Sequence, residues 1–255
     1  MAYSRELSFS LSVVSHGQSQ LVEKLLHDLA LMDSGNLEVL LTLNIPETLV
    51  FDSADYPFPV RVINNPTPKG FGANHNQAFA LSGAPYFCVV NPDIRLTDSP
   101  FQSLLDCLND ESVGIAAPMV LNPHGSVEDS ARQFPTIKKL WGKLFRRRWT
   151  SDYILEDGLA NVDWAAGMFM MFRRGVFARL NGFNERYFLY YEDVDICARA
   201  NLAGLRVVLS PVSRVTHYAQ RSSHRKLKYL YWHLGSMLRF LSSVEYRQLR
   251  QLKRL

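Results

Sequence analysis

Cysteine is scarce in this sequence, and the three cysteines stand far apart. Cys88, Cys107 and Cys197 form no CxxC pair, and they do not make up an even set for disulfides. Disulfides persist in oxidising compartments, where small domains carry even sets of cysteines. The pattern therefore excludes a disulfide-stapled scaffold and favours a reducing compartment.

Long apolar runs and a strong charge of one sign are also lacking. No window of eighteen residues is both apolar and uncharged, and residues 1–6 do not begin a basic-then-apolar leader. We therefore expect neither a transmembrane helix nor a signal peptide. The 28 basic and 24 acidic residues give a formal charge of +4, which is too weak to indicate a nucleic-acid-binding protein. These absences predict a cytoplasmic protein.

The residues that are present predict an α/β fold. Hydrophobic residues make up 47% of the 255 positions, which is enough for a sizeable core. Strand, helix and strand follow one another, and this order implies a parallel sheet with crossover helices. The predicted strands are 7–15, 37–43, 60–63, 86–90, 113–121, 162–172 and 205–209, and the predicted helices are 18–32, 100–108 and 227–255.

Polar residues follow the first two predicted strands. Ser15 and His16 come after the first strand, and Asn44 comes after the second. Ligands of parallel sheets lie beyond the carboxyl ends of the strands, so we expect these three residues to face a ligand.

A loop with two glycines precedes a short helical run that ends at Leu81. The loop contains Gly70, Gly72, Asn74 and Asn76, but it matches neither GxGxxG nor GxxxxGK[ST]. Glycine lets the backbone approach a ligand closely, and the polar side chains favour ligand contact. A plain turn before a helix is the alternative interpretation.

Another polar run, Asn91-Pro92-Asp93, ends the strand at 86–90. Oxygen atoms at positions i and i+2 suit a hard cation that also binds a diphosphate, because Mg²⁺ uses one or two carboxylates and completes its shell with phosphate and water. Asn-Pro-Asp is also good β-turn chemistry, so a turn without a metal is the alternative.

An aromatic run from Tyr187 to Tyr191 leads directly into Glu192, Asp193 and Asp195. Carboxylates beside aromatic side chains are costly unless they are paired, metal-bound or used. A helix is expected to begin here, which places Asp193 in its first turn, where the helix dipole favours the ionised form. Asp193 is then a candidate base, Asp195 is expected to pair with Arg199, and a capping cluster is the alternative interpretation.

In their order and spacing, these motifs resemble those of the inverting family 2 glycosyltransferases of GT-A fold. Within that family, the chain is similar to the rhamnosyltransferases that build bacterial O antigen and related cell-surface polysaccharides. The resemblance runs from His16 to about Leu241, and its markers are Gly70–Asn74, Asn91–Ile94, Val162–Gly167, Asn181–Asn184, Tyr191–Cys197 and His217–Tyr218. It implies a Rossmann-like, mainly parallel central sheet flanked by helices, with a C-terminal helical extension.

The resemblance also implies roles for single residues. Asp93 would bind Mg²⁺ or Mn²⁺ bridging the donor diphosphate, with His217 completing the metal shell, while Asn91 replaces the first Asp of the family motif. Asp193 would be the general base, paired with Glu192. The nucleotide sugar would contact Ser15, His16, Asn44, Gly70, Gly72, Asn74, Asn76, Asn91 and Asp93, and the acceptor would contact Arg132, Trp164, Gly167, Tyr191, Arg221 and Arg225.

We therefore expect transfer of a sugar, with L-rhamnose from dTDP-rhamnose as the leading donor, onto a polyprenyl-diphosphate-linked saccharide. A UDP-hexose donor and a non-catalytic sugar-nucleotide-binding protein are the alternatives. The sequence shows no repeat or linker, so one domain is predicted over 1–255. Its parts would be a nucleotide-sugar-binding half (1–121), an acceptor and catalytic half (122–224) and a basic C-terminal helix (225–255).

A basic and aromatic segment, 138–149, completes the list of candidates. Its apolar and aromatic residues share one helical face flanked by lysine and arginine, as in interfacial membrane anchors. This predicts a peripheral protein on the inner face of the cytoplasmic membrane. Ordinary packing of the stripe against the domain is the alternative. Arg221 and Arg225 are expected to bind the phosphates of the lipid-linked acceptor, because guanidinium groups make bidentate phosphate contacts.

Overall fold

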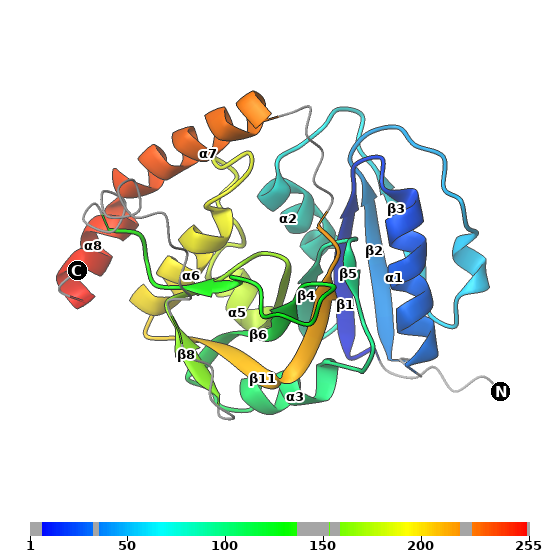
Figure 1. The fold of residues 1–255 in the computed structure, drawn as a ribbon, viewed down its shortest axis with the longest axis horizontal. Helices are drawn as coiled ribbons and strands as arrows, with labels where there is room; N and C mark the ends of the chain where they lie inside the picture. Colours follow the sequence, from blue (N-terminus) through cyan, green and yellow to red (C-terminus); the bar gives the residue numbers. More distant parts are fainter. Residues whose placement is uncertain (1–6, 33–35, 137–152, 154–158, 220–225, 254–255) are drawn as a thin grey trace.

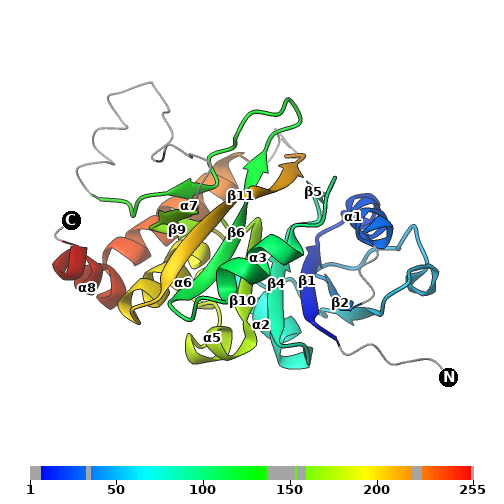
Figure 2. The ribbon, with the colours of Figure 1, turned by 90° about the horizontal axis from the view of Figure 1, so that it is seen from below.

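The fold is seen in a computed structural model that describes residues 7–32, 36–136, 153, 159–219 and 226–253. Its centre is a nine-stranded sheet in the order β3-β2-β1-β4-β10-β6-β11-β5, with β8 paired to β11 (Figures 1 and 2). Strands β1 to β4 run parallel to their neighbours, as do β6 and β11, whereas β10, β5 and β8 are antiparallel additions. The predicted α/β fold with a mainly parallel core is confirmed.

The first half of the chain follows the predicted order of elements closely. Its elements are β1 (Phe9–Ser15), α1 (Ser19–Leu31), β2 (Leu37–Leu43), the short 3₁₀ turn η1 (Ser53–Asp55), β3 (Val60–Asn64), α2 (Phe71–Leu81), β4 (Tyr86–Val90), β5 (Ile94–Arg95), α3 (Phe101–Leu108) and β6 (Val113–Leu121). Because β1, β2 and β4 are buried runs of apolar residues, they pair in the middle of the sheet.

The second half departs from prediction at 162–172, which is not one strand. The stretch divides into the end of β8 (Ala160–Val162), then β9 (Trp164–Ala165) and β10 (Phe169–Arg173). These three strands have different partners: β8 pairs with β11, β9 pairs with β7 (Ala131–Arg132), and β10 fits between β4 and β6. Gly167 therefore lies in the turn between β9 and β10, where the chain changes sheets, and not inside a strand.

Helices cover both faces of the sheet. Side chains of α1 and α3 pack with one face in one core cluster. The other face is covered by α2, α5 (Arg174–Arg179) and α6 (Glu192–Leu202), which share a second cluster with the C-terminal helices. The last long strand, β11 (Arg206–His217), extends further than the predicted 205–209 and ends beside β5. This arrangement brings the end of β11 next to the loop that follows β4.

The C-terminal region is two helices rather than one. Helix α7 (Lys226–Leu241) lies along the outer edge of the molecule, and α8 (Val244–Lys253) turns back beside α6 (Figure 1). Among the described helices, none combines the length and the apolar character needed to cross a bilayer. The predicted anchor at 138–149 and the two arginines Arg221 and Arg225 lie outside the described residues.

Candidate active site

Three buried asparagines meet at the carboxyl edge of the parallel strands and bond to one another. Asn65 donates from Nδ2 to Oδ1 of Asn44 (2.9 Å) and to Oδ1 of Asn74 (2.7 Å). Asn44 also accepts from the backbone N–H of Lys69 (2.8 Å) and donates to its carbonyl (3.0 Å). These amides hold the loop at 65–70 against the sheet.

The two residues after β1 have different surroundings. Ser15 is buried, and its Oγ accepts a hydrogen bond from the backbone N–H of Gln18 (3.1 Å), which closes the turn into α1. His16 is exposed, and its Nδ1 lies 3.4 Å from Nδ2 of Asn44. His16 is therefore the one of this pair that a ligand at the strand ends can reach.

The glycines at the start of α2 are required because another segment of the chain packs directly against them. A Cβ on Gly70 would lie 2.7 Å from the carbonyl oxygen of Phe188, and one on Gly72 would lie 2.6 Å from the Cβ of Phe183. Real Cβ atoms do not approach so closely, so only glycine allows this contact. The backbone N–H of Phe71 also donates to the Phe188 carbonyl (2.9 Å). The start of α2 is thus the platform on which the segment at 183–188 rests.

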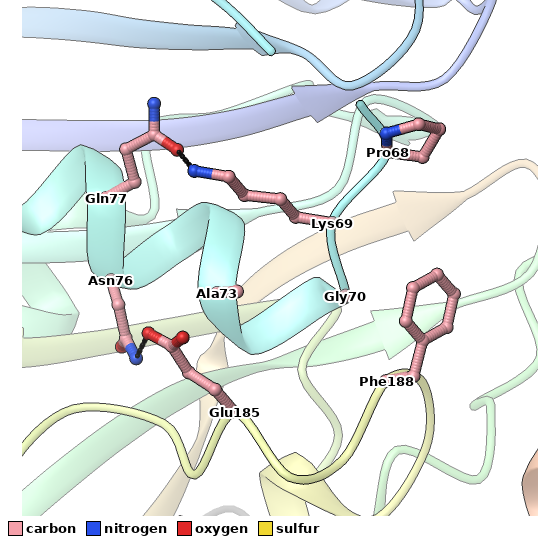
Figure 3. Close-up of a pocket in the computed structure, with 8 residues that line it drawn as sticks. All are labelled: Pro68, Lys69, Gly70, Ala73, Asn76, Gln77, Glu185 and Phe188. Carbon is pink, nitrogen blue, oxygen red and sulfur yellow. Dashed lines mark hydrogen bonds between the residues drawn. The ribbon is translucent and has the colours of Figure 1, made fainter. Parts of the chain in front are cut away.

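Asn76 locks the same segment from the side. Its Oδ1 accepts from the N–H of Phe183 (2.8 Å), and its Nδ2 donates to the Phe183 carbonyl (2.8 Å) and to Oε1 of Glu185 (2.9 Å). A cavity of about 570 Å³ lies beside these contacts, and Figure 3 shows Lys69 bonded to Gln77 across its rim. Its lining residues are Pro68, Lys69, Gly70, Ala73, Asn76, Gln77, Glu185 and Phe188.

The segment at 183–191 leads into the predicted acid cluster through strained backbone. Tyr190 and Tyr191 both have positive φ, 68° and 69°, a left-handed conformation that bulky residues rarely adopt. Such strain persists only where the surrounding structure fixes it, and it gathers at functional sites. Burial raises the pKa of the Tyr191 hydroxyl to about 12. The two tyrosines therefore set the direction in which α6 begins.

The three acids at the start of α6 have three different environments. Asp195 is fully buried and forms an ion pair with Nε of Arg199 (2.7 Å), as predicted. Glu192 is buried, and its Oε2 has no hydrogen-bond partner among the described residues. Burial raises the pKa of Glu192 well above its ordinary value, and the charges of Asp193 and Asp195 add to this rise. Burial and the neighbouring acids therefore both disfavour the charged form of Glu192.

The carboxyl group of Asp193 accepts hydrogen bonds from backbone donors. Its Oδ2 accepts from the N–H of Gly167 (3.0 Å) and its Oδ1 from the N–H of Val194 (2.8 Å). Burial raises the pKa of Asp193, and these two hydrogen bonds oppose the rise. More backbone hydrogen bonds favour the ionised form of Asp193 than that of Glu192. Asp193 is also partly exposed as a residue, whereas Glu192 is buried.

The turn at 166–168 joins the acid of α6 to the loop after β4. Gly167 bonds to Asp193, and one residue later the carbonyl of Met168 accepts from the N–H of Asn91 (2.9 Å). The ring of Phe71 lies 3.0 Å from where a Cβ on Gly167 would stand. A single backbone turn thus fixes the positions of both polar motifs.

Asp93 lies against the end of β11. His217 Nε2 is 3.2 Å from Oδ2 of Asp93, and His217 Nδ1 is 2.7 Å from Oε2 of Glu128. The backbone adds a hydrogen bond from the N–H of Tyr218 to the Asp93 carbonyl (2.9 Å). Burial lowers the pKa of His217, but the hydrogen bonds to Asp93 and Glu128 outweigh this effect and raise the pKa to about 9. The pairing of β5 with β11 therefore brings two predicted metal ligands together.

The donor set at this point fits a divalent cation that shares its shell with a diphosphate. The second carboxylate oxygen of Asp93, Oδ1, is buried and has no hydrogen-bond partner among the described residues. Glu128 orients the imidazole of His217 through Nδ1, as carboxylates do for metal-bound histidines. Within the described residues, no group of three or more His, Cys, Asp or Glu side chains converges to form a complete cage. The protein would therefore supply Asp93 and His217, whose imidazole would have to release a proton to bind the cation, and phosphate and water would fill the other positions.

The predicted acceptor residues that the structure describes gather near the start of α6. Arg132 is paired with Trp164 across β7 and β9, and it forms an ion pair with Asp129. Burial and the charge of Asp193 raise the pKa of Tyr191, and the positive charge of Arg132 opposes this rise. Trp164 donates from Nε1 to the carbonyl of Gln133 (3.2 Å). Together with Gly167, these residues frame the approach to the α6 acids.

Sequence reasoning missed Glu128 and Asn65. Asn-Pro-His-Gly at 122–125 is a turn sequence, and Glu128 follows it. The N–H of Glu128 donates to the Val120 carbonyl (2.8 Å), so Glu128 lies back along β6. The turn signal predicts this reversal, but only the pairing of β6 with β11 brings Glu128 to His217. Asn65 follows β3, and its position at a strand end was the one available signal.

Comparisons with known proteins agree with this geometry. A match to the family described as Glycosyltransferase like family 2 covers residues 7–230. Rhamnosyltransferase WbbL of Escherichia coli (strain K12) is 28% identical over 244 residues, which cover 90% of this chain and 91% of that protein. The N-acetylglucosaminyl-diphospho-decaprenol L-rhamnosyltransferase of Mycobacterium tuberculosis (strain ATCC 25618 / H37Rv) is 30% identical over 234 residues, which cover 83% of this chain and 76% of that protein.

Solved structures give the same fold at low identity. The mannosyltransferase PcManGT from Pyrobaculum calidifontis, in complex with GDP-Man and Mn²⁺, matches 93% of this chain with a TM-score of 0.60 at 14% identity. GalNAc-T7 with UDP, GalNAc and Mn²⁺ matches 85% with a TM-score of 0.64 at 15% identity. The chain spans 65% and 44% of the lengths of these two structures. The expected GT-A fold is confirmed.

Proposed function

Since the chain belongs to the Glycosyltransferase like family 2, we propose that it is an inverting rhamnosyltransferase acting on a lipid-diphosphate-linked saccharide. The leading donor is dTDP-L-rhamnose. The observation that carries this proposal is the contrast at the start of α6, where the carboxyl group of Asp193 accepts hydrogen bonds from two backbone donors beside a buried Glu192 whose pKa is raised. A protein that only bound nucleotide sugars would have no need for a reachable carboxylate in such surroundings.

The reaction is a single displacement. The acceptor hydroxyl oxygen forms a bond to the anomeric carbon while the bond from that carbon to the diphosphate oxygen breaks, and the diphosphate leaves with the electron pair. Asp193 takes the proton of the attacking hydroxyl. Because attack comes from the face opposite the leaving group, the anomeric configuration is inverted. Holding both substrates in this geometry supplies much of the acceleration.

Asp93 and His217 are the residues that would hold a divalent cation, Mg²⁺ or Mn²⁺. When bound, such a cation neutralises charge on the leaving diphosphate. The backbone N–H of Asn91 donates to the carbonyl of Met168, which fixes the turn. The side-chain amide of Asn91 would contact the nucleotide sugar. His16 and the start of α2 would complete the nucleotide-sugar side.

The acceptor side is proposed to lie between Trp164, Gly167 and Tyr191, which frame Asp193. Two relatives, the Escherichia coli and Mycobacterium tuberculosis proteins, are named as rhamnosyltransferases, which supports rhamnose as the transferred sugar. The name of the Mycobacterium tuberculosis protein supports a diphosphate-linked polyprenol carrying N-acetylglucosamine as the acceptor. Such an acceptor stays in the membrane, so the enzyme would work at the cytoplasmic surface of the bilayer as a peripheral protein.

The test is a donor panel. The purified protein is incubated with dTDP-rhamnose, UDP-glucose or UDP-N-acetylglucosamine, with Mn²⁺ and a polyprenyl-diphosphate-linked N-acetylglucosamine. We expect a rhamnosylated product with dTDP-rhamnose alone, with an inverted anomeric centre by NMR. A product from a UDP-hexose alone would replace the donor assignment. Nucleotide-sugar binding without any product would favour the non-catalytic alternative.

A further inference from the structure

Helix α7 carries an apolar stripe on the face that points away from the protein. The exposed fractions are large: 83% for Leu227, 52% for Leu230, 76% for Tyr231, 45% for Leu234 and 62% for Leu238. Positions i, i+3, i+4, i+7 and i+11 fall within a sector of about 100° of a helix with 3.6 residues per turn. The exposed residues therefore form one continuous face, which we call the α7 stripe.

The opposite face of α7 packs on the segment that leads into the candidate active site. The ring of Trp232 lies 4.9 Å from that of Phe188, and the ring of His233 lies 5.5 Å from that of Tyr191. Ser236 donates from Oγ to the carbonyl of Leu189 (2.9 Å). The backbone before Glu192 is thus separated from the α7 stripe by one helix diameter, about 10 Å.

Charge distinguishes an anionic surface from a second copy of the chain as the partner of this face. Residues 226–253 contain six basic residues and one acid, Glu245, so their formal charge is +5, whereas the whole chain has +4. Helix α7 itself has no acidic residue, and Lys228 lies over the ring of Trp232, 4.7 Å from its centroid, at the side of the stripe. Two copies meeting here would bring like charges together, while an anionic bilayer is complementary.

We infer that the α7 stripe is the surface on which the protein docks on an anionic lipid bilayer. The leucines and Tyr231 enter the headgroup region, and Lys228 at the side of the stripe contacts the lipid phosphates. Docking in this orientation brings the bilayer next to the segment before α6. A saccharide on a lipid diphosphate then reaches Asp193 from the membrane side, which is the part of the inference that rests on the proposed function.

Vesicle flotation of the full chain tests the inference. The stripe variant is Leu230→Gln, Tyr231→Gln and Leu234→Gln, and the matched control changes three scattered exposed residues, Leu31→Gln, Val50→Gln and Val212→Gln. We expect wild type and control to float with phosphatidylcholine vesicles that contain phosphatidylglycerol. The stripe variant should bind at least tenfold more weakly. Binding of wild type should fall in 0.5 M salt, because screening weakens the lipid attraction. Circular dichroism and thermal melting establish that both variants are folded.

Other outcomes would overturn the inference. Equal flotation of all three proteins would place the docking surface elsewhere, and a wild-type dimer that the stripe variant dissociates would make the stripe an interface between copies. A second measurement separates this inference from the proposed function. The stripe variant should transfer sugar to a short, water-soluble acceptor as wild type does, and should lose at least tenfold with the acceptor in vesicles. If wild type floats through the stripe but transfers no sugar to either acceptor, the proposed function fails and the docking surface stands.

Discussion

The difference between the two adjacent acids predicts opposite results for two conservative changes. In Asp193→Asn, an amide replaces the carboxylate that would accept the proton. In Glu192→Gln, an amide replaces a carboxyl group whose pKa burial raises well above the ordinary value, so that its neutral form is favoured. The two variants remove one carboxyl group each from neighbouring positions, so each is the control for the other.

The structure sets the expected magnitudes. Loss of a positioned base costs about 10²–10⁴-fold in kcat. Asn has one side-chain acceptor, while Asp193 uses two oxygens to accept from Gly167 and Val194. One backbone N–H therefore loses its partner in Asp193→Asn, which destabilises the fold by about 1–3 kcal/mol. For Glu192→Gln we expect less than about tenfold in kcat and about 1 kcal/mol or less in stability, because Oε2 has no hydrogen bond to lose.

Single-turnover kinetics with saturating donor and thermal melting measure both effects. In wild type, the rate should fall on the acid side with an apparent pKa above that of an ordinary aspartate, since burial raises the pKa of Asp193. Because Glu192 and Asp193 interact, this apparent pKa describes the titration of the two acids together and not of Asp193 alone. The acid limb should persist in Glu192→Gln. Near-normal turnover by folded Asp193→Asn, or a loss of 10²-fold or more in folded Glu192→Gln, would refute the assignment.

Three further changes test the metal ligand, a buried histidine and the platform under the active site. Asp93→Ala should weaken binding of dTDP at least about tenfold in Mn²⁺ and leave it unchanged in EDTA, as titration calorimetry would show. If wild type and Asp93→Ala bind dTDP equally well in Mn²⁺ and equally well in EDTA, Asp93 is only a turn residue. Burial lowers the pKa of His75 to about 3, while its unfolded value is about 6.5. The unfolded chain then binds the extra proton, so stability is full above pH 6.5 and falls as pH decreases towards 3, by up to about 5 kcal/mol. Urea unfolding of His75→Gln should lose this slope, and an unchanged slope would contradict the cause. Gly72→Ala should cost about 1–3 kcal/mol because the new Cβ meets that of Phe183, whereas Gly175→Ala, which meets nothing within 4 Å, should be neutral; similar melting temperatures for both would contradict the close-packing argument.

The parts of the fold that sequence predicted well are those fixed by local pattern. Runs of buried apolar residues at 37–43 and 86–90 predicted β2 and β4 almost to the residue. The position of Asp193 in the first turn of a helix was predicted from the spacing that follows it. The ion pair of Asp195 with Arg199 was also predicted, because residues four apart share a helix face.

The parts that were missed depend on which strands become neighbours. Residues 162–172 are mostly apolar and were predicted as one strand, yet the chain crosses between two sheets there, and only tertiary pairing decides this. The glycines at 70 and 72 were interpreted as room for a ligand, while the structure shows that they first make room for the segment at 183–188. Asn44 and Asn74 likewise bond to the protein, which pattern alone does not distinguish from ligand contact.

The contact between β4 and the turn at 166–168 explains how one site is built from distant parts of the chain. Because β10 runs antiparallel to β4, the turn that precedes β10 must lie at the carboxyl end of β4, beside Asn91. The same turn presents the N–H of Gly167 to Asp193. The position of the proposed base relative to Asp93 is therefore set across one turn, by the hydrogen bond from the N–H of Gly167 to the Asp193 carboxyl group and by the backbone bond from Asn91 to Met168. This connection keeps the proposed base, Asp193, at a fixed position relative to Asp93, while the surrounding loops can vary to accept different sugars.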